Sequence, residues 1–120
     1  MDLAGKEPIR IAIAGLGFGE SVHIPAARFN KNIELIGLWH PMEEKLQATC
    51  KRHDLIPYSN WEELINDPII EGIIIATPPS PRHELSIQAL EAGKHLLLEK
   101  PTCINADQVK DLQRKALQRN

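Results

Sequence analysis

Residues 9–19 read Ile-Arg-Ile-Ala-Ile-Ala-Gly-Leu-Gly-Phe-Gly, a β-branched run that ends directly in a cluster of glycines. The β-branched residues favour a strand, and the glycines favour a tight turn into a following helix. Gly15 would permit the turn, and Gly17 would let the backbone approach a phosphate at the positively polarised start of that helix. The stretch predicts a strand–turn–helix unit that seats a dinucleotide pyrophosphate, although a plain strand-to-helix turn can use the same glycines.

Strands and helices are predicted to alternate along the rest of the chain. Further strands are expected at 33–39, near 56–58, at 69–76 and at 94–98. Helices are expected at about 21–29, from Pro41 over the apolar positions Met42, Leu46 and Cys50, from a capping box at Ser59–Glu62 to Asp67, from Ser80-Pro81 to Ala92, and from Asn105 to about Leu117. This order predicts a doubly wound parallel α/β sheet, a Rossmann arrangement of about five strands with helices on both faces.

Length and composition predict one globular domain, residues 1–120, with a core from 8 to 117. A formal charge of -2 and 25% charged residues give no basis for nucleic-acid or membrane binding. The two cysteines, Cys50 and Cys103, lack metal-ligand spacing, so we expect reduced structural thiols and no metal site. The first residues do not resemble a signal peptide, and a cytoplasmic protein is expected.

Unusual residues follow four of the predicted strands. Gly15–Gly19 follows the first, Trp39-His40-Pro41 the second, Thr77-Pro78-Pro79 the fourth and Glu99-Lys100-Pro101 the fifth. Ligands bind beyond the carboxyl ends of strands in an open parallel sheet, so these segments are expected to converge on one site. Prolines that simply end strands would explain part of this pattern, but not a lysine between a glutamate and a proline.

Five segments together resemble one enzyme family. They are Gly15-x-Gly17-x-Gly19, Val22-His23-Ile24-Pro25-Ala26, Thr77-Pro78-Pro79 with His83, Ala92-Gly93-Lys94-His95, and Glu99-Lys100-Pro101. This combination resembles the glucose–fructose oxidoreductase/inositol dehydrogenase/MocA family over nearly the whole chain. The resemblance implies an NAD- or NADP-dependent oxidoreductase that transfers hydride to or from sugars, cyclitols or related hydroxy and carbonyl compounds.

The resemblance also implies roles for matched residues. Lys100 would be catalytic, since its ammonium could stabilise negative charge on the reacting oxygen. The glycine turn would hold the pyrophosphate, and the segments at Thr77 and Glu99 would line the nicotinamide half. The predicted cofactor-binding residues are Gly15, Leu16, Gly17, Phe18, Gly19, Trp39, His40, Lys45, Ala76, Thr77, Pro78, Pro79, His83, Glu99, Lys100 and Pro101.

Several of these assignments have structural alternatives. Trp39 could flank the adenine or anchor the end of its strand, and His83 could simply contact the start of its helix. His23 could face the cofactor or pack elsewhere, and Lys100 could be a solvated surface lysine.

Two departures from the family pattern bear on the cofactor. Glu20 stands where a small residue is usual, and we expect its carboxylate to turn away from the phosphates. His40 stands where an acid that binds the NAD ribose is usual. The missing acid and nearby Lys45 favour NADP slightly over NAD.

The resemblance further implies a second, substrate-binding domain, so the chain is expected to be a fragment of a longer two-domain enzyme. The small-molecule substrate and any homo-oligomer contacts would depend on that domain. The alternative functions are a non-catalytic nucleotide-sensing or protein-interaction module and, with less support, a CoA-type nucleotide-binding domain.

Overall fold

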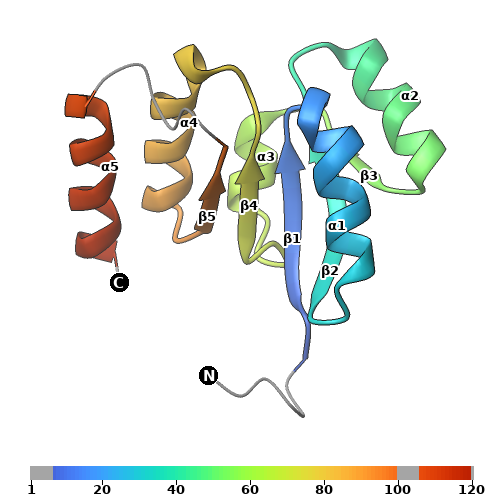
Figure 1. The fold of residues 1–120 in the computed structure, drawn as a ribbon, viewed down its shortest axis with the longest axis horizontal. Helices are drawn as coiled ribbons and strands as arrows, with labels where there is room; N and C mark the ends of the chain where they lie inside the picture. Colours follow the sequence, from blue (N-terminus) through green and yellow to red (C-terminus); the bar gives the residue numbers. More distant parts are fainter. Residues whose placement is uncertain (1–6, 100–105, 120) are drawn as a thin grey trace.

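Residues 7–99 and 106–119 are described by the computed structural model of the chain. They contain a five-stranded sheet in the order β3-β2-β1-β4-β5, with every neighbouring pair parallel. The strands are β1 (Ile9–Ala14), β2 (Ile33–Trp39), β3 (Ile56–Tyr58), β4 (Gly72–Ile75) and β5 (His95–Leu98). The strand order reverses beside β1, as Figure 1 shows. This confirms the predicted doubly wound α/β fold.

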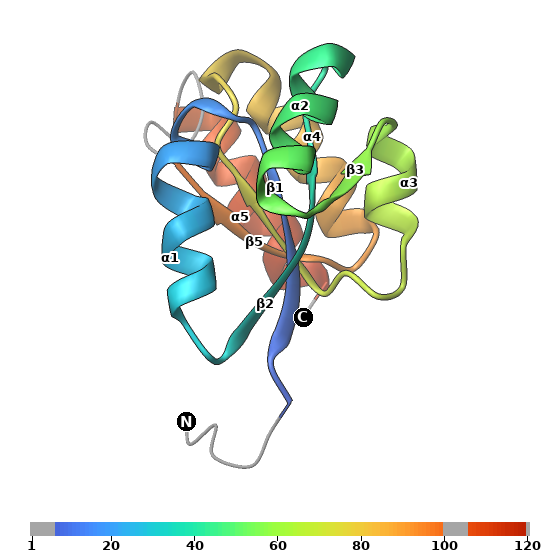
Figure 2. The same cartoon turned by 90° about the vertical axis from the view of Figure 1, so that its right-hand side faces the viewer.

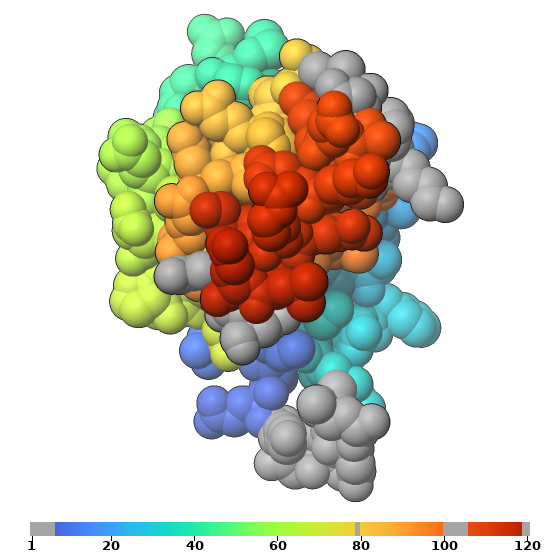
Figure 3. Space-filling model, turned by 90° about the vertical axis from the view of Figure 1, so that its left-hand side faces the viewer, coloured from blue at the N-terminus to red at the C-terminus, as the bar shows by residue number. Residues whose placement is uncertain are grey.

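Helices cover both faces of the sheet. They are η1 (Gly19–His23), α1 (Ile24–Phe29), α2 (Glu43–His53), α3 (Trp61–Asn66), α4 (Pro79–Glu91) and α5 (Ala106–Arg119). In the view along the sheet, α1 lies on one side and α3 on the other (Figure 2). Helix α5 is the outermost element beyond α4 (Figure 1), and it covers that end of the molecule in the space-filling view (Figure 3).

Successive residues of β1 enter two different cores because strand side chains alternate between faces. Ala12 packs in the cluster that contains Trp61 of α3. Ile13 packs in the cluster that contains Ile24 of α1 and Leu46 of α2. Strand β1 is therefore covered on both sides, and its carboxyl end is held in place from both faces.

The first helical segment begins earlier than the predicted Ser21. Helical backbone starts at Gly17, and η1 precedes α1 without a break. Pro25 therefore lies well inside the segment and not in its first turn. Proline has no N–H, and its ring conflicts with a regular helix; a wider turn directly before it, in which the Ile24 N–H binds the Gly19 carbonyl, accommodates it.

Helix α2 begins at Glu43, not at Pro41. Met42 precedes the helix and is 62% exposed, so its predicted place on the apolar stripe is wrong. Leu46 and Cys50 are buried, as predicted. Burial raises the pKa of the Cys50 thiol to about 11, and this free cysteine stays protonated at neutral pH.

The predicted capping box at the start of α3 is wrong. The Asn60 side chain, not Ser59, accepts a hydrogen bond from the Glu62 N–H at 2.8 Å. Ser59 instead donates its hydroxyl to Glu43 at 2.7 Å. Asparagine is as good an N-cap as serine, and the contact with α2 decided which of the two residues took that role.

Other element boundaries also differ from the prediction. Strand β4 begins at Gly72 because Asp67 binds the backbone N–H groups of Ile69 and Ile70 in a turn. Helix α4 begins at Pro79, since proline suits the first helical position, where no N–H is needed. It ends before Gly93 (φ 84°), as predicted, and α5 extends to Arg119. Within the described ranges, no helix is long and apolar enough to cross a membrane.

Candidate functional site

The loops that follow β1, β2, β4 and β5 are joined at the carboxyl edge of the sheet. Backbone hydrogen bonds extend the strand pairing one residue beyond the strands, from the Gly15 N–H to Trp39 (3.0 Å), from the Ala76 N–H to Ala14 (2.7 Å) and from the Glu99 N–H to Ile75 (3.1 Å). The first residues of these segments therefore lie side by side at this edge, and residues 100 and 101 are outside the described part of the chain.

The glycine turn lies directly against the loop after β4. Gly15 has a φ of 99°, and a Cβ atom there would lie 2.6 Å from the Ala76 carbonyl carbon and 2.8 Å from the Thr77 nitrogen. The strand order reverses between β1 and β4, and open α/β sheets bind ligands at such a reversal. Only glycine can occupy this position, because both the backbone conformation and the space exclude a side chain.

The other residues of the glycine turn have different environments. A Cβ atom on Gly17 would meet nothing within 4 Å, so a ligand can approach its backbone closely. A Cβ on Gly19 would lie 3.1 Å from the Ile13 side chain. Gly19 is therefore the residue at which η1 packs closely against β1. The Leu16 side chain is buried in the core and only its backbone could bind a ligand, whereas the Phe18 side chain is exposed.

Glu20 is paired with the end of α2. Its Oε2 lies 2.7 Å from the Arg52 guanidinium and 3.0 Å from His53 Nε2. These hydrogen bonds, that of Arg52 first, hold the pKa of Glu20 below its ordinary value. Arg52 and His53 therefore hold the Glu20 carboxylate against α2, in agreement with the expectation that it turns away from the phosphates.

Replacing Glu20 with glutamine is expected to destabilise the chain by about 1 kcal/mol at pH 7. A carboxyl with a lowered pKa stabilises the fold above its unfolded-state pKa of about 4.3, and this contribution is lost as the pH falls through the folded-state pKa. Urea unfolding should show a larger difference in the free energy of unfolding between the two proteins at pH 7 than at pH 3. Glu34→Gln, at an exposed position of β2, is the control. A difference independent of pH would contradict the assignment.

The end of β2 places an aromatic residue and a histidine beside α2. The Trp39 ring packs edge-on against Trp61 at a centroid distance of 5.0 Å, which supports its role as an anchor of the strand end. His40 Nδ1 accepts the Met42 N–H at 3.0 Å. Burial, then the charge of exposed Lys45, lowers the pKa of His40. A neutral His40 therefore carries its proton on Nε2 and can donate it to a ligand.

The loop after β4 leads into α4. Thr77 is 5% exposed, and its hydroxyl has no hydrogen-bond partner among the described residues. Pro78 is exposed at the start of the helix. His83 lies in the second turn of α4, where its Nε2 is 2.9 Å from Asp111 of α5. The contact of His83 is therefore with another helix, not with the start of its own.

Glu99 is held by three groups in the structure. Its N–H binds Ile75 at 3.1 Å, its carboxylate accepts a hydrogen bond from His23 of η1, and its carbonyl accepts one from Arg82 of α4. Arg82 also donates to the Thr77 carbonyl. We did not single out Arg82 from the sequence, although its i, i+4 and i+7 spacing with the buried residues Ser86 and Ala89 places it on the inner face of α4.

Lys100 and Pro101 lie outside the described residues, as do Cys103, Asn105 and the side chain of Pro79. Their predicted roles stay predictions. Among the residues that are described, no group of three or more His, Cys, Asp or Glu side chains could hold a metal ion.

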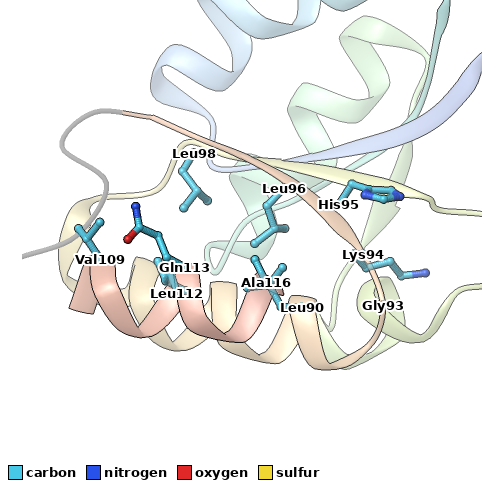
Figure 4. Close-up of a pocket in the computed structure, with 10 residues that line it drawn as sticks. All are labelled: Leu90, Gly93, Lys94, His95, Leu96, Leu98, Val109, Leu112, Gln113 and Ala116. Atoms are coloured by element: carbon cyan, nitrogen blue, oxygen red, sulfur yellow. The ribbon is translucent and has the colours of Figure 1, made fainter. Parts of the chain in front are cut away.

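A cavity of about 490 Å³ lies away from this site, between α5, β5 and the end of α4. Figure 4 shows Leu98 and Val109 toward one end of it and Lys94 and His95 toward the other. None of the predicted site residues lines this cavity, and its walls are mostly aliphatic.

The residues at the carboxyl edge fit a dinucleotide. The backbone at Gly17 is accessible, the turn enters a helix, and the loops after β1 and β4 meet at the strand-order reversal. Residues 9–120 match the model of the GFO_IDH_MocA oxidoreductase family, which has an NAD-binding Rossmann fold. The chain belongs to this family.

Individual family members confirm the assignment. An uncharacterized oxidoreductase of Synechocystis sp. is 39% identical over 95% of this chain and 31% of its own length. Galactose 1-dehydrogenase of Pseudomonas fluorescens is 36% identical over 81% of this chain and 30% of its own length. A biliverdin reductase of Synechocystis sp., solved with biliverdin and NADP+, has a TM-score of 0.86 and 29% identity over 93% of this chain and 35% of its own. The chain thus spans about a third of the length of these relatives.

Proposed function

We propose that residues 1–120, with a core from 8 to 117, are the dinucleotide-binding domain of a longer cytoplasmic oxidoreductase. This enzyme transfers hydride between a nicotinamide cofactor and a sugar, cyclitol or related hydroxy or carbonyl compound. The main support for cofactor binding is the close contact between Gly15 and the loop after β4, together with the open space beside Gly17. Similarity to a galactose 1-dehydrogenase supports the substrate class. The substrate-binding domain and any homo-oligomer contacts would belong to the rest of the enzyme.

The glycine turn would bind the pyrophosphate through its backbone. The first N–H groups of a helix have no acceptor within the helix, and the helix dipole makes this end positive. Leu16 and Gly19 would contribute backbone only, since their side-chain positions face the core. Phe18, exposed at the start of the helix, would cover the outer side of the phosphates.

The loops after β4 and β5 would bind the nicotinamide half of the cofactor. The Thr77 hydroxyl, which no described residue pairs, is the kind of buried group that a ligand would satisfy. Glu99 is anchored beside it through the shared contacts with Arg82. Ala76, Pro78, Pro79, His83 and Pro101 complete the proposed contacts of this half.

Lys100 would be the catalytic residue that this chain contributes. The bound nicotinamide would supply the chemistry of hydride acceptance or donation. The Lys100 ammonium would hydrogen-bond the reacting oxygen of the substrate and stabilise negative charge that develops there. Its proton could also be shared with that oxygen during the reaction.

His40 and Lys45 would surround the adenosine ribose, with Trp39 behind them. No carboxylate follows β2 at position 40 to accept hydrogen bonds from a free 2′-hydroxyl, and the His40 Nε2–H and the Lys45 ammonium are both donors. These groups favour a 2′-phosphate, so we propose NADP as the preferred cofactor and NAD as the weaker one.

Titration of the chain with NADP and with NAD tests these assignments. Amide NMR shifts are expected at Gly17, Thr77 and Glu99, and NADP is expected to bind more tightly. His40→Asp should reverse the preference by about tenfold, because a carboxylate binds the ribose hydroxyls and repels a phosphate. Lys51→Asp, at an exposed position of α2, is the control for added negative charge and should leave the order of preference unchanged. No shifts at millimolar concentrations of either ligand would contradict cofactor binding, and tighter NAD binding would contradict only the preference for NADP.

A further inference from the structure

Arg82 is the only described arginine that is almost fully buried, with 2% of its surface exposed. A guanidinium stays charged at all accessible pH values, so burying it requires acceptors placed to match its planar donors. It projects from the inner face of α4, together with the fully buried Ser86 and Ala89. A residue needed only to fill this space could be apolar.

Two acceptors of Arg82 lie in separate loops. Its Nη2 donates to the carbonyl of Thr77, two residues after β4, and its Nη1 donates to the carbonyl of Glu99, directly after β5. One side chain thus bridges the two loops beyond the last backbone hydrogen bonds that pair β1, β4 and β5. A lysine, with a single ammonium group, lacks this planar two-pronged geometry.

The carbonyl carbon of Glu99 is covalently bonded to the nitrogen of Lys100. The Glu99 side chain is bound by His23 of η1, and its N–H is bound by Ile75. Glu99, the residue before Lys100 in the sequence, is therefore tied to the glycine-turn helix through His23 and to the Thr77 loop through Arg82.

We infer that Arg82 is a positioning residue for the nicotinamide half of the site. It holds together the Thr77 and Glu99 loops that line this half. The inference rests on the proposed function. It assigns Arg82 no contact with the ligand, and it predicts that loss of Arg82 weakens binding of the nicotinamide half but not of the adenosine half.

Binding of NADH and of ADP-ribose to Arg82 variants tests this inference, because ADP-ribose lacks only the nicotinamide ring. Arg82→Met, which keeps much of the side-chain volume, is expected to weaken NADH binding about tenfold and to leave ADP-ribose binding within about twofold. The NADH affinity of Arg82→Lys should lie between those of Arg82→Met and the unchanged chain. Added guanidinium ion should restore NADH binding to Arg82→Ala at concentrations that do not unfold it.

Arg10 provides a matched control at the opposite edge of the sheet. Its Nε donates to the Ile69 carbonyl at 2.8 Å, so Arg10→Met also removes an arginine–carbonyl bond. We expect the ratio of the dissociation constants for NADH and ADP-ribose to be the same in this variant as in the unchanged chain.

Other results of the Arg82 experiments would overturn the inference or the proposed function. An equal loss of both ligands in Arg82→Met, or a failure of both Arg82→Met and Arg82→Lys to fold, would make Arg82 a structural residue and overturn the inference. Unchanged NADH binding would overturn it too. If the unchanged chain binds neither these two ligands nor NADPH, the proposed function itself fails, and the inference fails with it.

Discussion

Gly15→Ala is expected to destabilise the chain by about 3 kcal/mol or more, enough to unfold a marginally stable domain. At a φ of 99° any side chain is strained, and the new Cβ would lie 2.6 Å from the carbonyl carbon of Ala76. Neither residue can move easily, because sheet hydrogen bonds hold the backbone of both. Urea unfolding monitored by circular dichroism would measure the loss.

Gly17→Ala is the matched control for this substitution. A Cβ there meets nothing within 4 Å, so the free energy of unfolding should stay within about 0.5 kcal/mol of the original. Dinucleotide binding should nevertheless weaken, since the methyl group occupies the space through which a phosphate would reach the backbone. A Gly15→Ala chain as stable as the Gly17→Ala chain would contradict the packing of the turn against the Ala76 loop.

Lys100→Met in the full-length enzyme is expected to lower kcat by about 10²- to 10³-fold, the usual cost of removing a donor to a developing negative charge. Binding of ADP-ribose, which has only the pyrophosphate and adenosine half of the cofactor and its second ribose, should change little, because the contacts proposed for that half do not involve Lys100. NAD(P)H formation at 340 nm, with galactose and other sugars as the first substrates, would report the change.

Lys110→Met is the control for loss of a lysine, because Lys110 is exposed on α5. It should leave kcat unchanged. If the Lys100→Met enzyme turned over at the original rate, the proposed catalytic role would be wrong. A large rise in KM with kcat unchanged would instead indicate a role in binding alone.

Most of the fold could be predicted from local sequence. The β-branched run before Gly15 and the regular alternation of strands and helices determined the doubly wound sheet, because strand and helix periodicities depend on nearby residues. Boundaries were less predictable where two local solutions compete. Ser59 and Asn60 can both cap α3, and only the contact of Ser59 with Glu43 of α2 decided between them.

The candidate site divides in the same way. The positions of Gly15, Trp39, Thr77 and Glu99 at one edge followed from the sequence, because each lies at the carboxyl end of a parallel strand or just beyond it. The partners of individual side chains did not. His83 contacts Asp111 of α5, and Glu20 contacts Arg52 and His53 of α2.

The sequence by itself determined the fold class, the glycine turn and the edge of the sheet where the site lies, since these depend on strand order and local backbone preference. Only the tertiary structure showed that Arg82 joins the Thr77 and Glu99 loops and that His23 reaches Glu99. These contacts span up to 76 positions along the chain, and a buried charge selects its acceptors from whatever the packed fold brings within reach.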